Sequence, residues 1–428
     1  MRTFFLIAGL IFWVNSLAQI DKTKEPLEFF NGTIVRSYAV NNEFPDHMLV
    51  GIKGEPGDAK VYHSPDSGTN WKVLNSDQPL CDSCEDVQTV CFLDDKTFLA
   101  GTWKNGLFIS RDNGKTFSPI KKFPAKDIRS VVRAPMGTLF VATTSHGILA
   151  SEDSGKTWKN THDAELIDEL ACWKLCIAPK SNNILYALTF DNGVYKSINS
   201  GETWDRVIYE KDVMIWDLAF IENEIYAVGG SENENYLFRS YMGDKNWRKF
   251  KLNIFGNVNS LNIFKTFNDY FLLMGTWKNG IHKSYAIEYS LQGFSCIPII
   301  EEDTTGVSQV YSNDEYVYNF TWGDGIKRFE RAKECGLDIP RFTAPGNTNF
   351  DPFKIEPTCP LEYFFLRLYD KNGEEVLRDS STNVMGSNTK MNSKDNFKKP
   401  GSYIYWIKAS FKDEVDTFSV NGYIKVIL

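Results

Sequence analysis

The sequence predicts an all-β protein: a seven-bladed β-propeller over residues 25–333, followed by a small immunoglobulin-like β-sandwich over residues 335–428. Three observations support this fold class. A short phrase built around serine, aspartate and glycine recurs along the first part of the chain. Each copy lies among short apolar segments that are separated by turn residues. The residues after 333 lack the phrase and form alternating strand patterns with turn signals between them.

The N-terminus reads MRTFFLIAGLIFWVNSLAQ, with a positive start at Arg2 and an apolar run from Phe4 to Val14. Ser16 and Ala18 supply the small residues that a signal peptidase reads. The pattern predicts a secretory signal peptide over residues 1–18. The apolar run is shorter than the about 20 residues that span a bilayer, and no later run reaches that length. We therefore expect no transmembrane segment.

The charge of the chain excludes two classes of partner. The 428 residues carry a net charge of −8, and Lys and Arg do not gather in a block. Such a chain has no electrostatic footprint for nucleic acid. It also lacks the basic face that anionic membranes attract.

The recurring phrase is S-x-D-x-G-x-[TN]-[WF]. It is complete at 64–71, 110–117 and 151–158. At 197–204 the aspartate is replaced by Asn199, and residues 240–247 match the phrase only in part. Shorter traces follow, so that copies start at 64, 110, 151, 197, 240, 284 and 329, which is 41 to 46 residues apart. Self-similarity at this period is typical of propellers and solenoids.

Each repeat unit predicts four short strands, which is one propeller blade. In the second unit the apolar segments 89–93, 97–102, 107–110 and 117–123 are separated by three turns. The turn between the second and third strands contains Asn105-Gly106, a pair that accepts positive φ angles. The turn between the third and fourth strands contains the aspartate phrase.

The polar residue at the third position of the phrase is expected to be structural. Its side chain can accept hydrogen bonds from backbone N–H groups and so close an Asx-type turn. This role falls to Asp66, Asp112, Asp153 and Asn199. The alternative, a set of catalytic carboxylates, would require these side chains to meet at one pocket, whereas one aspartate per blade spreads them around a ring. The aromatic residue that ends the phrase is expected to pack against the neighbouring blade.

The first and last blades are expected to share strands. The seventh blade begins near Gly306 and has only three strands before Cys335. Its missing outer strand is predicted at residues 25–30, before the first blade. Such a strand would close the ring and remove exposed sheet edges.

Chain order places the turns between second and third strands, together with the connections between blades, on one face of the propeller. These 2–3 turns carry aromatic and amide side chains that suit a sugar or a peptide. The candidate ligand-binding residues are Trp103, Asn105, Phe190, Trp277, Asn279 and Trp322. The alternative is that each ring packs across its own hairpin. The third blade has Ser145-His146 at this place instead.

The chain has eight cysteines, and export permits disulfides. Cys81 and Cys84 can close a small loop, and Cys335 and Cys359 flank the first segment of the C-terminal region, so both pairs are candidate disulfides. The pairing of Cys91, Cys172, Cys176 and Cys296 is left open. The single C-x-x-C has no second ligand pair at zinc spacing, so we expect no metal site.

The repeated phrase resembles the Asp-box (BNR) repeat family over roughly residues 30–330. That family includes sialidases, sortilin-type receptors, xyloglucan-active glycosidases and photosystem II assembly factors. The resemblance implies a β-propeller, and it implies either an enzyme or a binding protein.

Features of the family's enzymes are missing from the chain. The sialidases place an Arg-Ile-Pro motif before the first repeats, whereas here Ile339-Pro340-Arg341 stands in another order after the propeller. The xyloglucan-active enzymes use two propellers with an aspartate pair across a cleft. We therefore expect no catalytic residues and no cofactor. The alternative is a secreted glycoside hydrolase, sialidase-like or xyloglucan-active-like, with two carboxylates about 5–10 Å apart on the 2–3 turn face.

The C-terminal residues resemble the gliding motility-associated C-terminal domain of Bacteroidetes, which is the type B sorting domain of the type IX secretion system. The matching segments are Ile339-Pro340, Phe342-Thr343, Phe353, 368–370, 400–405 and 422–428. Residues 344–351 depart from the family's P-N-G-D-G-x-N-D motif. The resemblance implies export through the type IX translocon, contact with outer-membrane attachment proteins, and a secreted or cell-surface location.

These features together predict a non-catalytic binding or scaffold protein outside the cell. Its propeller would bind a surface glycan or a protein partner, and this reading includes a component of the secretion or gliding apparatus.

Overall fold

The computed structural model describes residues 24–76, 78–161, 171–231, 234–242, 246–254, 256–265, 270–277, 280–285, 297–300 and 306–331. It also describes the strand segments 337–338, 342–343, 354–357, 361–369, 375–382, 389–390, 401–411 and 417–426. Contacts divide the chain into two compact units, with the boundary at residues 331 and 332. Strands are the only regular secondary structure in the described ranges.

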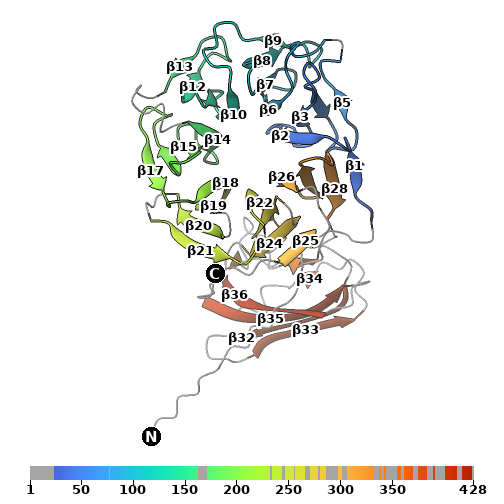
Figure 1. Cartoon of the computed structure of the whole chain (residues 1–428). Coiled ribbons are helices and arrows are strands. Elements are labelled where there is room, and N and C mark those ends of the chain that lie inside the picture. The colour runs from blue at the N-terminus through green and yellow to red at the C-terminus, as the bar shows by residue number, and fades with distance from the viewer. Residues whose placement is uncertain are drawn as a thin grey trace. The chain divides into compact units, whose positions relative to one another are not determined.

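The first unit is a seven-bladed β-propeller, in which seven four-stranded antiparallel sheets surround a common axis (Figure 1). The first strands lie next to the axis: β2 (Ile34–Val40), β6 (Val87–Phe92), β10 (Ile128–Arg133), β14 (Cys172–Ile177), β18 (Met214–Ile221), β22 (Val258–Lys265) and β26 (Val307–Ser312). The second strands follow: β3 (Met48–Lys53), β7 (Phe98–Thr102), β11 (Leu139–Thr143), β15 (Leu185–Thr189), β19 (Glu224–Gly230), β23 (Tyr270–Thr276) and β27 (Tyr316–Thr321).

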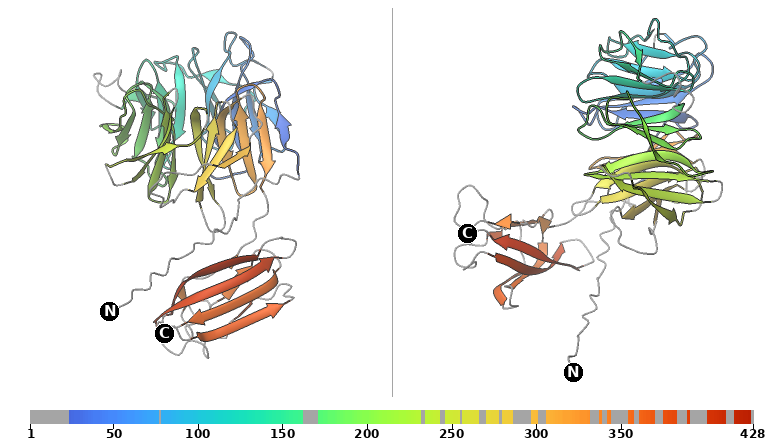
Figure 2. Two further views of the ribbon diagram at one scale, coloured as in Figure 1. Left: turned by 60° about the horizontal axis from the view of Figure 1, so that its bottom comes forward. Right: turned by 90° about the vertical axis from the view of Figure 1, so that its left-hand side faces the viewer.

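The third strands are β4 (Val61–Ser64), β8 (Leu107–Ser110), β12 (Ile148–Ser151), β16 (Val194–Ser197), β20 (Asn235–Tyr241), β24 (Ile281–Tyr285) and β28 (Ile326–Glu330). The outer strands are β5 (Lys72–Val73), β9 (Ser118–Pro119), β13 (Lys159–Asn160), β17 (Asp205–Ile208), β21 (Arg248–Leu252), β25 (Ile297–Ile300) and β1 (Leu27–Phe29). Figure 2 shows the same sheets from two further sides.

The ring is closed by the N-terminal strand, as the sequence predicts. Strand β1 pairs antiparallel with β28, so that the last blade has the order β26-β27-β28-β1. Phe30, just after β1, also packs against the first blade, with its ring centroid 4.2 Å from that of Tyr62 and 5.7 Å from that of Trp71. The two ends of the propeller are therefore joined both by backbone pairing and by an aromatic cluster.

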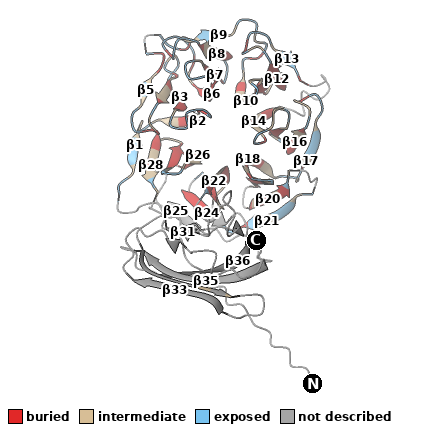
Figure 3. Ribbon diagram, turned by 180° about the vertical axis from the view of Figure 1, so that it is seen from behind, coloured by how far each residue is buried: buried red, intermediate tan, exposed pale blue. Residues whose placement is uncertain are grey.

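In the blades whose burial is described from the axis to the rim, burial falls from the middle strands to the outer strand (Figure 3). The second strands β7, β11 and β15 are buried at every position, whereas the two residues of β9 and of β13 are exposed. The predicted outer strand 117–123 of the second blade is therefore wrong in length, because an outer strand pairs on one side only and gains little from burial. Strand β8 has the predicted bounds, and β6 begins two residues before the predicted 89.

A circle of side-chain hydrogen bonds joins the seven inner strands. In each blade a side chain near the start of the inner strand bonds to the inner strand of the next blade, at 2.5 to 3.4 Å. The links are Ser37 with Val87, Thr89 with Val131, Ser130 with Leu175, Lys174 with Asp217, Asp217 with Leu261, Asn259 with Val307, and Gln309 with Arg36. Buried polar groups are thus satisfied between sheets that share no backbone pairing.

One link of the circle is an ion pair. Lys174 Nζ lies 2.6 Å from Asp217 Oδ1, and Asp217 is buried. Asp217 also accepts hydrogen bonds from the backbone N–H groups of Leu218 and Leu261. Burial would lower the pKa of Lys174, but the attraction of Asp217 outweighs it and holds that pKa above its ordinary value.

The aspartate phrase forms the same turn in four blades. The serine hydroxyl donates to the side chain two residues later at 2.8 to 2.9 Å, and accepts from the glycine N–H at 2.8 to 2.9 Å. In the third blade Asp153 Oδ1 accepts from Thr157 N–H at 2.8 Å, and in the fourth Asn199 does the same with Thr203 at 3.0 Å. Gly155 has φ near 81°, a region that glycine enters without strain. The amide of Asn199 closes the turn as the carboxylates do, which is what a structural role predicts.

Acid should destabilise the turn around Asp112 in the native chain, whereas an Asp112→Asn variant should not show this acid-dependent loss. The backbone N–H and hydroxyl of Thr116 donate to Asp112 and lower its pKa to about 2, against about 3.9 in an unfolded chain. Asp112 therefore stabilises the fold above about pH 4, and this contribution is lost as the pH falls towards 2. We expect the gap between the unfolding midpoints of the native chain and the variant to shrink from pH 7 to pH 2.5. A gap that widens on acidification would contradict this assignment.

The second unit contains two sheets. A five-stranded sheet has the order β30 (Phe342–Thr343), β36 (Thr417–Val426), β35 (Gly401–Phe411), β32 (Leu361–Tyr369) and β33 (Glu375–Thr382). A three-stranded sheet has the order β29 (Leu337–Asp338), β31 (Lys354–Pro357) and β34 (Thr389–Lys390). The immunoglobulin-like packing of this region stays a prediction.

Of the predicted disulfides, Cys81–Cys84 is confirmed. Cys91, Cys172 and Cys176 are free thiols. Cys296, Cys335 and Cys359, like the predicted signal peptide, lie outside the described residues. Within the part of the chain that the structure describes, no helix is long and apolar enough to span a bilayer.

Candidate ligand-binding face of the propeller

The 2–3 turns of five blades share a hydrogen-bonded form that fixes the position of one side chain. A threonine at the end of the second strand donates to the carbonyl of the glycine four residues later, at 2.8 to 3.0 Å. These threonines are Thr102, Thr143, Thr189, Thr276 and Thr321. The residue after the threonine therefore has an equivalent place in each blade, and it is Trp103, Thr144, Phe190, Trp277 and Trp322 in turn.

All seven inner strands contain a β-bulge at the same place, next to these turns. In the second blade, for example, Val87 pairs with Thr102 and Thr89 with Gly101, so that Gln88 is the extra residue. A bulge redirects a side chain away from the regular alternation. Seven redirected side chains thus form a ring at one end of the inner strands, called the bulge ring below: Arg36, Gln88, Arg129, Trp173, Trp216, Asn259 and Ser308.

Four tryptophans of this face form a continuous arc across four blades. Ring centroids of Trp173 and Trp216 lie 5.5 Å apart, those of Trp216 and Trp277 5.6 Å apart, and those of Trp277 and Trp322 6.1 Å apart. Trp277 remains 43% exposed. The rings of Trp277 and Trp322 thus contact partners from other blades, beyond their own hairpins.

Two arginines of the bulge ring also contact aromatic rings of this face. The Arg36 guanidinium lies 4.8 Å from the Trp322 ring centroid and its Nε donates to Asp86 at 3.1 Å. The Arg129 guanidinium lies 3.3 Å from the ring centroid of Trp103, which is 38% exposed, and 5.4 Å from that of Phe190. Burial lowers the pKa of Arg129 to about 10, although Asp127 and Asp86 oppose this shift.

Five of the seven side chains of the bulge ring line a cavity of about 510 Å³, and Trp216 and Asn259 do not. Arg36, Arg129, Trp173 and Trp322 line it at the 2–3 turn end, where Gln88 and Ser308 join them. At the other end the lining includes Asn41, Glu43, Asp94 and Arg133. A cavity of this size takes a few residues of a peptide or two to three sugar rings.

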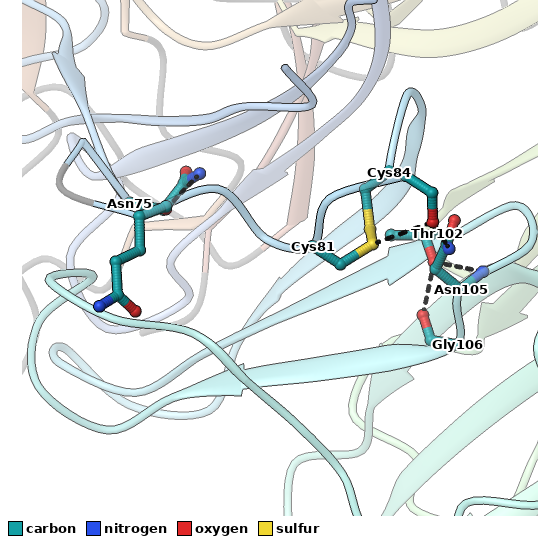
Figure 4. Close-up of a disulfide and its surroundings, with 8 residues drawn as sticks. Asn75, Cys81, Cys84, Thr102, Asn105 and Gly106 are labelled. Carbon is teal, nitrogen blue, oxygen red and sulfur yellow. Dashed lines mark hydrogen bonds between the residues drawn. A yellow bond between two sulfur atoms is a disulfide. The ribbon is translucent and has the colours of Figure 1, made fainter. Parts of the chain in front are cut away.

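Asn105 has a structural partner. Its Nδ2 donates to Ser83 Oγ at 2.8 Å, within the loop that Cys81 and Cys84 close (Figure 4). This contact ties the disulfide loop to the 2–3 turn of the second blade. Asn279 lies outside the described residues. At the third blade, Asp127 accepts hydrogen bonds from Thr144 and Ser145, and Ser145 Oγ lies 2.8 Å from His146 Nδ1.

The bulged residues were not foreseen from the sequence. Arg129, Trp173 and Trp216 stand one residue after an apolar residue at the start of a predicted strand, where regular alternation gives no sign of a bulge. The recurrence of a polar or aromatic residue at this place in every repeat is the one signal that could have indicated a common role.

Acidic residues are scarce around the cavity. Within the described residues that line it, only Glu43 and Asp94 are acidic, and both belong to the end opposite the 2–3 turns. Asp94 accepts hydrogen bonds from the N–H groups of Lys96 and Thr97, as a turn residue does. Among the described side chains, no three His, Cys, Asp or Glu residues are grouped as a metal site requires.

Comparison with known proteins agrees with the fold. Residues 64–215 match the DUF6242 beta propeller domain. No curated protein sequence matches the chain. Among solved structures, YCF48 from Cyanidioschyzon merolae is 13% identical, with a TM-score of 0.52 over 72% of this chain and 98% of that one. A YCF48 structure described as bound to D1 peptide is also 13% identical, with a TM-score of 0.51 over 72% of this chain and 97% of that one.

A bacterial structure is also similar. PorZ of Porphyromonas gingivalis, described as a surface component of the type-IX secretion system, is 15% identical, with a TM-score of 0.49. The match covers 90% of this chain and 58% of PorZ. At 13% identity the two YCF48 structures establish the propeller fold alone.

Proposed function

We propose that the chain is a secreted or cell-surface binding protein, whose propeller holds a protein partner or a glycan on the 2–3 turn face. The observation that carries this proposal is the gathering of aromatic and cationic side chains from separate blades on the 2–3 turn face, where several of them line the cavity. Trp103, Phe190, Trp277 and Trp322 come from four different 2–3 turns, and the bulge ring adds Arg36, Arg129, Trp173 and Trp216. Aromatic and arginine side chains are the types that most often dominate binding energy.

The export route in this proposal depends on the resemblance of residues 335–428 to type B sorting domains. A protein that leaves the cell by this route would meet the translocon and outer-membrane attachment proteins, and its propeller would then face surface partners. A role within the secretion or gliding apparatus is included. The YCF48 structure bound to a peptide supports the capacity of a similar propeller for peptide binding.

A glycoside hydrolase is the second candidate. It would need two carboxylates that face the cavity from the 2–3 turn side. The acidic residues that line the cavity, Glu43 and Asp94, belong to the other end, which favours binding without catalysis.

A Trp277→Ala variant should lose binding. The protein is captured from the surface of intact cells with its bound partners, and the purified chain is applied to a glycan array. We expect a specific partner or glycan class with the native chain and at least a tenfold loss with the variant, because truncating an interface tryptophan costs about 2 kcal/mol or more. Met136→Ala is the matched control, since Met136 is 83% exposed in a turn of the opposite face. Equal loss with both variants, or a chain that is never accessible on intact cells, would contradict the proposal.

A further inference from the structure

The two arginines of the bulge ring differ in their partners. Arg36 is neutralised by Asp86, as described above. Among the described residues, Arg129 has neither an ion pair nor a hydrogen bond, and its Nε is buried. The nearest acidic side chains are already engaged, because Asp127 accepts from Thr144 and Ser145 and Asp86 accepts from Arg36. The planar guanidinium of Arg129 therefore lies near two aromatic rings and has unused hydrogen-bond donors.

Other unused donors lie on the same ring. Trp173 Nε1 and Ser308 Oγ are buried without a hydrogen-bond partner among the described residues, and both side chains line the cavity. Buried polar groups are nearly always paired in folded proteins, and exceptions need a reason. Three such groups, from three blades and all at bulge positions, favour a ligand that accepts hydrogen bonds at several points.

The arrangement of the tryptophans favours a peptide over a sugar. The planes of Trp173 and Trp216 are inclined by 68°, those of Trp216 and Trp277 by 54°, and those of Trp277 and Trp322 by 56°. A sugar ring stacks on a flat platform, whereas rings inclined at these angles leave angular hollows that take apolar side chains. Peptide carbonyls would also accept the hydrogen bonds that Trp173 and Ser308 have to offer.

From this geometry we infer that the ligand is a peptide segment that carries a carboxylate, which Arg129 binds while the tryptophan arc holds adjacent apolar side chains. The inference rests on the proposed function and specifies the class of ligand at the same face. Arginine binds a carboxylate through two parallel hydrogen bonds, and its stacking on Trp103 and Phe190 fixes the plane of the guanidinium in advance. Burial of the cation, which lowers the pKa of Arg129, adds to its attraction for an anion.

The test uses the full chain and two matched arrays of random hexapeptides, one with free and one with amidated C-termini. We expect the bound peptides to combine a carboxylate with aromatic or aliphatic residues. If amidation of the C-terminus abolishes peptide binding, the recognised carboxylate is the C-terminal one. If replacement of Asp and Glu by Asn and Gln abolishes binding, the carboxylate belongs to a side chain. Selection of neutral or basic peptides would overturn the inference.

Arg129→Met should lower the affinity of the chain for the selected peptides about tenfold to a hundredfold. Arg129→Lys should lower this affinity less, because lysine keeps the charge and loses only the geometry of two parallel hydrogen bonds. Arg206→Met is the control, since Arg206 also stacks on an aromatic ring, 4.5 Å from Tyr209, and is exposed outside the cavity. If Arg129→Met does not fold, Arg129→Lys alone decides. Equal binding by the native chain and the Arg129 variants would overturn the inference.

The failure of the inference is distinguishable from that of the proposed function. Glycan binding that is sensitive to Trp277→Ala, without peptide binding, would overturn the peptide class and leave the binding face in place. Absence of binding to peptides, glycans and cell-surface partners alike would overturn both.

Discussion

Replacing Lys174 with methionine is expected to lower the free energy of unfolding by about 3 to 5 kcal/mol. The change leaves Asp217 as an unpaired charge in a buried position, and removal of one partner from a buried ion pair typically has a cost of this size. It also opens the hydrogen-bonded circle between the fourth and fifth blades. The measurement is urea unfolding of the full chain, followed by tryptophan fluorescence.

A double variant separates the charge from the packing. Lys174→Met combined with Asp217→Asn removes both charges, and the amide oxygen that replaces the carboxylate can still accept a hydrogen bond from Leu261 N–H. We expect the double variant to recover most of the stability that the single variant loses. If the two variants are equally unstable, the ion pair is not the link that this account describes.

Phe30→Ala is expected to lower the free energy of unfolding by about 2 kcal/mol, because the removed ring packs against Tyr62 and Trp71 of the first blade. Truncation of Phe30 should also affect the closure of the propeller ring. The segment from Leu27 to Phe30 joins the last blade to the first, so a weaker join allows the ring to open at one seam. We expect a lower unfolding midpoint and a less cooperative transition, measured by calorimetry.

Leu27→Ala is the matched control for this seam. Leu27 belongs to the same segment, in strand β1, pairs with Arg328 and is 47% exposed, so its truncation should change stability by less than about 0.5 kcal/mol. Equal effects of the two substitutions would show that the aromatic cluster does not hold the seam.

The repeat made most of the fold predictable. Copies and traces of the phrase at intervals of 41 to 46 residues predict the number of blades, and the three strands after Gly306 indicate that a strand from elsewhere completes the last one. The Cys81–Cys84 disulfide follows from the short spacing of the two residues. The length of outer strands such as β9 was less predictable, because an exposed strand that pairs on one side carries no strong apolar pattern.

The binding face was predictable only in outline. Chain order alone places Trp103, Phe190, Trp277 and Trp322 on one face. The bulges that bring Trp173, Trp216 and Arg129 to this face shift the pairing register of each strand by one residue. The pattern of polar and apolar residues in the sequence does not indicate such a shift. The contact of Trp216 with Trp277 depends on the packing of two neighbouring blades, which brings together residues from separate repeats.

We propose above that the partner of this protein binds the 2–3 turn face. Photo-cross-linking on intact cells tests it most directly, with a benzophenone amino acid placed at position 277 in one chain and at position 136 in another. A defined cross-linked product is expected from position 277 and none from position 136. Cross-linking from position 136 to the same extent, or no product from position 277, would contradict it.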